Sequence, residues 1–335
     1  MRVLVTGSSG FVGIPLCLEL AKRGVEVHAL VRKLTPDSPL SHPNIKVFVG
    51  DIEDPASLDK AVKGCEGVYH LAAFTGIWTR DKQQFHKVNV IGTDNVLAAA
   101  VRAGVKRIVV TSTAGVMGPS PGEGVLVDEA SDSANYFATD YEITKRESEK
   151  LAFGYLSRGL DVMVVNPSRV YGPGLLKETN SVTRLVKMYR EGKWRFIPGN
   201  GNSRGNYVYI DDVVHGHLLA MEKGLPGERY ILGGDNISYN GLFGLIKKLT
   251  GKNYRLFHLP LGPMLLFARI QVLMADWFGR KPLIVPALVK KYTRDWNLSS
   301  RKAQTHLGYT ITPIAEGLKK TLDWIVDQDS EGTQL

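Results

Sequence analysis

A glycine-rich turn between two apolar segments is the feature that most constrains the fold of this chain. Residues 3–5 are all aliphatic, residues 14–23 have helical periodicity, and the turn between them carries Gly7, Gly10 and Gly13. A helix N-terminus leaves backbone N–H groups free and carries partial positive charge, so a pyrophosphate can sit there when no side chain intervenes. The pattern predicts a strand–turn–helix unit that binds a dinucleotide.

The spacing of this turn, G-x-x-G-x-x-G, is one residue longer in its first gap than the common dinucleotide fingerprint. Three glycines also occur in loops that are merely flexible. The strand before the turn and the helix after it favour the binding interpretation. The residues predicted to contact the cofactor here are Gly7, Ser9, Gly10, Phe11, Val12 and Gly13.

The composition is that of an ordinary soluble globular protein, long enough for one or two domains. Hydrophobic residues make up 44% of the 335 residues, and 42 basic against 33 acidic residues give a net charge of +9. The basic residues are dispersed without an aromatic-interleaved stripe, so we expect no nucleic-acid partner. Two cysteines, Cys17 and Cys65, predict neither a disulfide framework nor a metal site. No segment resembles a secretory signal, which favours a cytoplasmic location.

Residues 25–31 form the second predicted strand, and the two residues after it indicate which dinucleotide binds. In dinucleotide folds this position faces the adenosine ribose, where an acidic side chain accepts hydrogen bonds from the ribose hydroxyls. Arg32 and Lys33 stand there instead. Because arginine pairs bidentately with phosphate, the cofactor is predicted to be NADP. NAD is the alternative, if the two residues are only a charged surface pair.

Further strands over residues 45–49, 67–73 and 107–110 alternate with helical segments, among them a long helix over 84–103. This alternation predicts an α/β fold with a doubly wound parallel (Rossmann) sheet, whose ligand lies at the carboxyl ends of the strands.

Residues at these strand ends extend the predicted cofactor site. Asp51 is placed to accept a hydrogen bond from the adenine amino group, although it also suits a turn before the helix start at Asp54. Small side chains after the fourth strand let the backbone lie against a ligand. His70 is interpreted as a hydrogen-bonded core residue, as is common for a histidine that ends a buried strand. The predicted contacts are Asp51, Ile52, Leu71, Ala72, Ala73 and Thr111.

Tyr141 and Lys145 lie four residues apart in a helix predicted to run to about residue 158, so their side chains share one face. A tyrosine pKa is ordinarily about 10, and a neighbouring ammonium with a positive nicotinamide ring lowers it. Lys145 is also placed to hold the nicotinamide ribose, and Thr113 to hydrogen-bond the substrate oxygen. A Y-x-x-x-K pair alone also arises by chance. With the other motifs, it predicts a proton-transfer site beside a hydride carrier.

Taken in order, these motifs resemble those of the extended short-chain dehydrogenases/reductases. The resemblance continues through N-P-S-R-V-Y-G-P-G at 166–174 and N-Y-V-Y-I-D-D-V at 206–213. It implies that Tyr141 is the catalytic acid/base with Lys145 as its partner, and that Thr113 fills the family's Ser/Thr position. It also implies that Pro167 and Ser168 lie near the nicotinamide. A homodimer built through the helices near 84–103 and 140–158 is a further implication.

Within that family, the segment 166–168 and the C-terminal pattern at 279–282 and 300–309 resemble the dihydroflavonol-reductase and 3-beta-hydroxysteroid-dehydrogenase group. The resemblance implies an oxidoreductase that acts on a ketone or secondary alcohol of a bulky apolar substrate, steroid-, flavonoid- or lipid-like. Ala114 and Gly115 replace the Asp-Glu pair with which dehydratases follow the threonine, so dehydration is not expected.

Two alternatives remain open. One is an NAD-dependent sugar-nucleotide epimerase, because Arg204 stands where such an enzyme places a diphosphate-binding arginine; a structural salt bridge explains this residue equally well. The other is a non-enzymatic redox sensor, although such a sensor need not keep Tyr141 and Lys145 together.

From about residue 175 the strand–helix alternation loosens, which predicts a smaller C-terminal α/β substrate domain. The dinucleotide-binding domain is placed at 1–174, with return segments from about 205–235, and the substrate domain mainly at 175–330. A helix over 211–223 is predicted to be capped by Asp211. A polar tail over 328–335 is expected to be flexible.

Residues 261–278 form the most apolar stretch. Pro263, Arg269 and Asp276 interrupt it, and a spanning helix needs roughly 20 mostly apolar residues, so a transmembrane segment is not expected. One interpretation is a helix that covers an apolar substrate pocket. The other is peripheral membrane contact through 261–285, with Arg280 and Lys281 near lipid headgroups.

Overall fold

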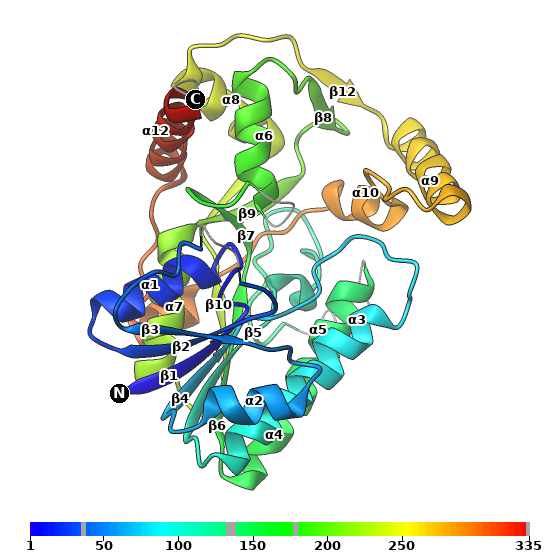
Figure 1. Ribbon diagram of the computed structural model, residues 1–335. Coiled ribbons are helices and arrows are strands. Elements are labelled where there is room, and N and C mark those ends of the chain that lie inside the picture. Colours follow the sequence, from blue (N-terminus) through cyan, green and yellow to red (C-terminus); the bar gives the residue numbers. More distant parts are fainter. Residues whose placement is uncertain (35–37, 132–138, 177–179, 333–335) are drawn as a thin grey trace.

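Seven parallel strands form the central sheet in the computed structural model, which describes residues 1–34, 38–131, 139–176 and 180–332 (Figure 1). The strand order is β10-β6-β5-β4-β1-β2-β3, and every neighbouring pair is parallel. The strands are β1 (Arg2–Thr6), β2 (Glu26–Val31), β3 (Ile45–Val49), β4 (Gly67–His70), β5 (Arg107–Thr111), β6 (Asp161–Pro167) and β10 (Arg229–Leu232).

Each face of this sheet has its own hydrophobic core, because successive side chains of a strand point to opposite faces. In β1, Val3 and Val5 join one core while Leu4 joins the other. Helices α1 (Gly13–Lys22), α7 (Ile210–Lys223) and α11 (Arg301–Leu307) contribute to the first core. Helices α2 (Pro55–Val62), α4 (Gly92–Arg102) and α5 (Asp140–Gly154) contribute to the second. The predicted doubly wound α/β fold is confirmed.

The helix expected over 84–103 consists of three segments, α3 (Gln84–His86), a π-helical segment over Lys87–Ile91, and α4. Asn89 lies in the π-helical segment and is buried. Its amide group accepts from the backbone N–H of Phe74 at 2.7 Å and donates to Thr144 on α5 at 3.0 Å. A π-helical turn of this kind often marks a functional site, and here it ties the loop after β4 to α5.

The C-terminal part builds a third core beside the carboxyl ends of the central strands, in the upper half of Figure 1. One small sheet has the order β11-β9-β7, and another pairs β12 with β8. Their strands are β7 (Arg169–Tyr171), β8 (Phe196–Pro198), β9 (Arg204–Tyr209), β11 (Asp235–Ser238) and β12 (Phe257–Leu259). The helices packed there are α6 (Ser181–Arg190), α8 (Tyr239–Thr250) and α12 (Ile314–Gly332).

Two local expectations are wrong. Helix α7 starts at Ile210 with Tyr209 as its N-cap, so Asp211 lies inside the first turn rather than capping the helix. Residues 328–332 of the expected flexible tail belong to α12, because Asp329 forms ion pairs with Lys187 and Arg190 on α6. Residues 333–335 lie outside the described part of the chain.

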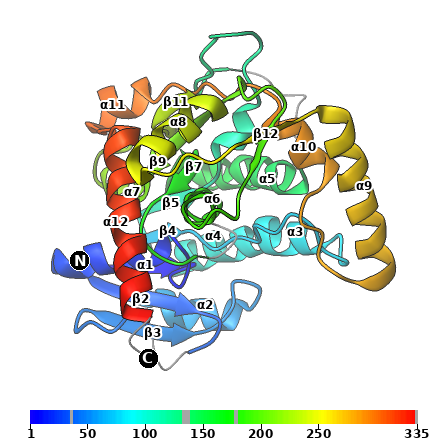
Figure 2. The ribbon, with the colours of Figure 1, turned by 90° about the horizontal axis from the view of Figure 1, so that it is seen from above.

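Helix α9 (Leu261–Phe278) projects from the side of the molecule, where it packs against α10 (Pro286–Tyr292) (Figures 1 and 2). Only Ala268 and Ala275 of its 18 residues are buried. Seven residues separate these alanines, so they form a narrow stripe along one side of the helix. By length and composition alone the helix is apolar enough to cross a membrane.

Candidate active site

A cleft of about 930 Å³ opens at the carboxyl ends of the central strands. Segments from β1, β2, β4, β5, β6 and the start of α5 contribute to its wall. Most of the residues that the sequence predicts for the site line it together: Gly7, Ser9, Gly10, Phe11, Val12, Gly13, Arg32, Asp51, Ile52, Leu71, Ala72, Ala73, Thr111, Thr113, Tyr141, Pro167 and Ser168. Lys33 and Lys145 do not line it.

The glycine turn has no room for side chains. A Cβ on Gly13 would lie 2.1 Å from the carbonyl oxygen of Gly7, and a Cβ on Gly7 would lie 2.6 Å from the backbone nitrogen of Ala72. Gly7 also has φ of 69°, in the left-handed region. Helix α1 follows with no side-chain cap and no acidic residue in its first turn. Its free N–H groups therefore suit an anionic ligand.

Two further observations fit a dinucleotide. The hydroxyls of Ser112 and Ser168 are buried without a hydrogen-bond partner, and both residues line the cleft. Unpartnered buried polar groups are rare, because each costs the desolvation energy of the group. A polar ligand in this cleft would supply the missing partners.

At the ribose end, Arg32 is exposed and lines the cleft, whereas Lys33 is exposed and lies outside the wall. The chain bends immediately after β2, so only the first residue of the pair borders the cleft. Asp51 lines the cleft while one of its carboxylate oxygens accepts from the N–H of Glu53 at 3.0 Å. The helix start predicted at Asp54 is confirmed, since its carboxylate accepts from the N–H of Ala56.

His70 is a core residue, as interpreted from the sequence. Its Nε2 lies 2.9 Å from the hydroxyl of Thr93, which itself donates to the carbonyl of Asn89. Nε2 therefore carries the proton, and Nδ1 accepts from Thr6 at 2.7 Å. Burial, with the charge of Lys145, lowers the pKa of His70 to about 3. Because Thr6 also accepts from the N–H of Ala72, this chain of bonds holds the loop beside the cleft.

Tyr141 borders the cleft in the first turn of α5, and Lys145 lies one turn further along, almost fully buried. Burial, with the charge of Glu142, raises the pKa of Tyr141 above its usual value. The lowering expected from Lys145 is thus absent in the free protein, and the phenol is protonated at neutral pH. Burial lowers the pKa of Lys145 to about 8, and Glu149 opposes this shift.

The N-terminus of α5 is fixed on both sides. Thr139 and Glu142 form a capping box, in which the Glu142 carboxylate accepts from the Thr139 N–H at 2.9 Å. The other oxygen of Glu142 pairs with Lys291 at the end of α10. Helix α10 is therefore anchored beside Tyr141.

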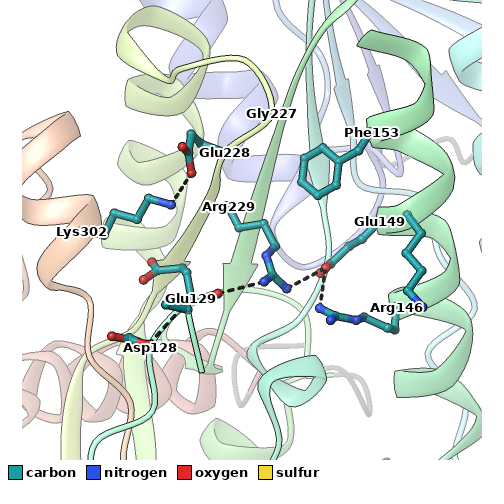
Figure 3. Close-up of a pocket in the computed structure, with 11 residues that line it drawn as sticks. Asp128, Glu129, Arg146, Glu149, Phe153, Gly227, Glu228, Arg229 and Lys302 are labelled. Atoms are coloured by element: carbon teal, nitrogen blue, oxygen red, sulfur yellow. Dashed lines mark hydrogen bonds and ion pairs between the residues drawn. The ribbon is translucent and has the colours of Figure 1, made fainter. Parts of the chain in front are cut away.

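Glu149, one turn beyond Lys145, belongs to a second pocket of about 590 Å³ lined by α5 and by residues 227–229 at the start of β10 (Figure 3). Its carboxylate contacts Arg146 and Arg229, and it accepts from Asn166 at 2.7 Å. Arg229 also donates to the backbone carbonyl of Glu129. Acidic and basic side chains pair with one another there, so this pocket braces α5 against β10 and is not the candidate active site.

The two threonines at the end of β5 have different roles. Thr111 donates to Nε2 of His217 at 2.9 Å, because the Nδ1 of that histidine is bonded to the carbonyl of Val213. Thr113 accepts from the N–H of Gly115 at 3.2 Å, which leaves its own proton available to a ligand. Thr113 is therefore an available hydroxyl donor in the cleft wall that Tyr141 also lines.

Other residues of the wall were not predicted from the sequence: Leu30, Gly50, Glu53, Phe74, Thr75, Gly76, Gln84, Val88, Ser112, Val170, Leu175, Leu176, Arg184 and Lys281. Ser112 had a signal, since it lies between Thr111 and Thr113. Arg184 and Lys281 had none, because only the fold brings α6 and the segment after α9 to the cleft. Lys281, which one interpretation of the sequence places near lipid headgroups, borders the cleft.

Arg204 does not line the cleft. Its guanidinium donates to the backbone carbonyl of Asn236 at 2.7 Å, and its backbone N–H donates to Asp295. The side chain is thus exposed and bonds to the neighbouring strand β11, and it forms no ion pair with the residues that the structure describes.

Comparisons with known proteins agree with this arrangement. The model of the "NAD dependent epimerase/dehydratase family" matches residues 3–233. A "Putative dihydroflavonol 4-reductase" of Synechocystis is 32% identical over 98% of this chain and 96% of its own length. A "Sterol demethylase protein B" of Methylococcus capsulatus is 36% identical over 75% of each chain. A Thermotoga maritima UDP-glucose 4-epimerase, solved with UDP-glucose, has a TM-score of 0.81 at 27% identity, covering 98% of this chain and 99% of that one.

Proposed function

The chain belongs to the NAD dependent epimerase/dehydratase family and is an oxidoreductase of the extended short-chain type, and we propose that it is an NADP-dependent reductase of ketones on bulky apolar substrates. The observation that carries this proposal is a protonated phenol, Tyr141, in the wall of the same dinucleotide-sized cleft that the hydroxyl donor Thr113 also lines. The reverse reaction, oxidation of the secondary alcohol, uses the same groups.

The proposed roles follow from the protonation states. The reduced nicotinamide, when bound, supplies a hydride to the carbonyl carbon. Tyr141 donates its proton to the carbonyl oxygen, and Thr113 orients that oxygen by a hydrogen bond. Lys145 carries a pKa of about 8, so it is mostly charged at neutral pH and stabilises the phenolate that remains.

Arg32 supports NADP as the cofactor. It borders the cleft directly after β2, where the adenosine ribose is expected, and the neighbouring acidic residue Asp51 is engaged by the N–H of Glu53. A guanidinium at this position pairs with a 2′-phosphate in a fork-like geometry.

Two observations support an apolar substrate over a sugar nucleotide. Phe74, Leu175 and Leu176 add apolar surface to the cleft. Arg204, the arginine expected to hold a diphosphate in an epimerase, is bonded elsewhere. The names of the reductase and sterol-processing relatives point in the same direction.

The test compares Tyr141→Phe with Tyr155→Phe, which removes a hydroxyl that bonds to Asp94 away from the cleft. For Tyr141→Phe, kcat for ketone reduction should fall by about 100- to 10,000-fold, the contribution of a general acid. The affinity for NADPH should stay unchanged. Tyr155→Phe should keep near wild-type turnover. Survival of activity in Tyr141→Phe within tenfold would refute the proposed role.

A further inference from the structure

Arg169, the first residue of β7, is a partly buried cation for which the described residues provide no anionic partner. Its Nη1 donates to the hydroxyls of Tyr207 and Tyr239 at 3.0 and 3.1 Å. Its guanidinium carbon lies 5.4 to 5.7 Å from the ring centroids of Tyr207, Tyr239 and Tyr292. Its Nη2 is buried and has no hydrogen-bond partner. No carboxylate in the described part of the chain forms an ion pair with it.

This arrangement is costly for the protein alone. Arginine remains charged under all ordinary conditions, and an unpaired charge removed from water costs far more than a neutral polar group. Ring faces and phenol oxygens offset part of that cost. The two N–H groups of Nη2 remain open, and a guanidinium edge is the group that best matches a carboxylate.

The Arg169 guanidinium packs closely against Gly205, and the strand that carries it lies next to the cleft. A Cβ on Gly205 would lie 2.4 Å from Nη1, so a larger residue there would displace the guanidinium from its present position. Arg169 follows Ser168, which lines the cleft, and is itself partly exposed. Tyr292 follows Lys291, which pairs with Glu142 next to Tyr141. Arg169 itself is absent from the cleft wall, whereas its neighbours Ser168 and Val170 line it, so β7 borders the cleft.

We propose that Arg169 binds a carboxylate carried by the substrate, which makes the substrate class oxo or hydroxy acids with a large apolar part. The identity of the substrate's reacting group rests on the proposed function, whereas binding of a carboxylate does not. Arg169 is in this view a specificity-determining residue and takes no part in proton transfer.

The test measures binding of decanoate and of decanol by calorimetry to protein saturated with NADP⁺. The wild type should bind decanoate about 10- to 100-fold more tightly than decanol, as expected for a hydrogen bond to a charged group. Arg169→Met should abolish this preference, and Arg169→Lys should retain part of it. Arg195→Met, which removes another guanidinium stacked on a tyrosine, is the control and should leave the preference unchanged.

The binding measurements would overturn the proposal if decanoate did not bind, if the two ligands bound equally, or if the preference survived in Arg169→Met. Thermal unfolding separates binding from structure, because removal of an unpaired buried charge should not lower the Tm of ligand-free protein. A collapse of Arg169→Met, together with an unchanged preference in Arg169→Lys, would also overturn it. Failure of the proposed function would appear separately, as absence of NADPH-dependent reduction of both neutral ketones and oxo acids by the wild type.

Helix α9 carries a second inference from an independent observation. Large apolar side chains cover its surface on several sides; Trp277 is 80% exposed, Phe278 68% and Leu283, just beyond the helix, 80%. None of residues 261–278 lines the cleft, so the expectation that the helix covers the pocket is not supported. Exposed apolar patches of this kind mark interaction surfaces.

The charges around α9 favour one occupant. Arg269, Arg280, Lys281 and Lys290 are exposed along or beside the helix. The acidic residue of the helix, Asp276, accepts a hydrogen bond from Trp78. A basic rim around an apolar helix matches a bilayer with anionic headgroups. Lys281 also borders the cleft, so the same face leads to the active site.

We infer that α9 and residues 279–285 dip into an anionic membrane surface. Flotation with vesicles of phosphatidylcholine, with and without phosphatidylserine, tests this directly. The wild type should float with the anionic vesicles and less so at high salt. Replacing Leu273, Trp277 and Leu283 together by serine should lower partitioning at least about tenfold, given the apolar area removed. Replacing the exposed Phe196 and Phe257 by serine is the matched control and should change nothing.

Absence of the wild type from anionic vesicles, or equal flotation of the triple variant, would overturn this inference. The inference would also be overturned if light scattering showed that the wild type is a dimer, that the triple variant is a monomer, and that neither binds vesicles. A second copy of the chain would then cover this face. NADPH binding, measured in parallel, should be the same in all three proteins.

Discussion

The proposed cofactor side and the proposed substrate side of the molecule, the latter comprising Arg169 with its tyrosines and helix α9, are stabilised in opposite ways. On the cofactor side, backbone meets backbone at Gly7 and Gly13, and the hydrogen bonds around His70 leave neither ring nitrogen unpartnered. On the substrate side, Arg169 keeps an unpartnered Nη2 and α9 keeps most of its apolar surface exposed. A closed network suits a ligand that is always held in the same way. The unpartnered Nη2 and the exposed apolar surface instead require a ligand that supplies the missing hydrogen-bond acceptor or apolar contact.

The largest effect that separates the two sides is expected for a methyl group at the glycine turn. Gly13→Ala should weaken NADPH binding about 10- to 100-fold or more, because its Cβ would lie 2.1 Å from the Gly7 carbonyl and overpacking of this kind costs about 1–3 kcal/mol. Gly244→Ala in α8 is the control, since nothing lies within 4 Å of the added Cβ. It should leave binding unchanged and raise stability slightly. If fluorescence titrations gave the same NADPH dissociation constant for Gly13→Ala and Gly244→Ala, close packing at the glycine turn would not matter for cofactor binding.

A smaller effect is expected at the ribose end. Arg32→Asp should reverse the preference for NADPH over NADH, with a change of about 10- to 100-fold in the ratio of dissociation constants, as for the loss of a charge-assisted pair. Lys33→Asp should change this ratio much less, because Lys33 lies outside the cleft wall. If Arg32→Asp and Lys33→Asp changed the ratio of dissociation constants equally, Arg32 and Lys33 would act only through their net charge and not through a direct contact of Arg32.

The buried histidines of the cofactor side predict a loss of stability in acid. Burial lowers the pKa of His70 to about 3 and that of His217 to about 4, below the unfolded value of about 6.5. Below pH 6.5 the unfolded chain binds protons that the folded chain cannot, so stability falls as the pH drops toward these values. At pH 5 each histidine costs about 2 kcal/mol.

Urea unfolding at pH 7 and pH 5 measures this effect. His217→Gln should lose less stability between the two pH values than the wild type does. His258→Gln, at an exposed position beyond the cofactor side, should behave like the wild type. If His217→Gln lost as much stability between pH 7 and pH 5 as the wild type does, the acid sensitivity would arise from other groups.

The smallest effect is expected where α12 meets α6. Asp329→Ala removes the ion pairs with Lys187 and Arg190, and it should lower the free energy of unfolding by less than about 1 kcal/mol, because the pairs are partly exposed. Cofactor affinity should be unaffected. A larger loss in denaturant titrations would mean that the end of α12 supports the third core more than its exposure suggests.

The cofactor side was largely predictable because its signals are local. Glycine spacing, strand periodicity and the Tyr141–Lys145 interval each depend on residues close in sequence, and the fold assembles them into one wall. Local patterns do not predict the effect of burial. In the ligand-free protein the pKa of Tyr141 is raised, because the phenol is buried and Glu142 lies beside it, whereas the expected lowering includes the charge of a bound nicotinamide ring.

The substrate side was less predictable because its groups come from distant segments. Arg169, Tyr207, Tyr239 and Tyr292 span more than a hundred residues, and no local pattern joins them. The polar residues 328–332 looked like a frayed tail, and only their packing next to α6 explains why they are helical. The apolar stretch at 261–278 was correctly predicted to be a helix. Its exposure could not be predicted, because it depends on which distant segments pack against the helix.

Transfer of an isotope label tests the central claim most directly. Protein is incubated with an apolar ketone and NADPH that carries deuterium at the transferable position of the nicotinamide, and the released product is examined by mass spectrometry. The account predicts one deuterium on the carbinol carbon in the wild type and none in Tyr141→Phe. Release of unlabelled product, or an inverted sugar-nucleotide centre with no net consumption of added cofactor, would contradict it.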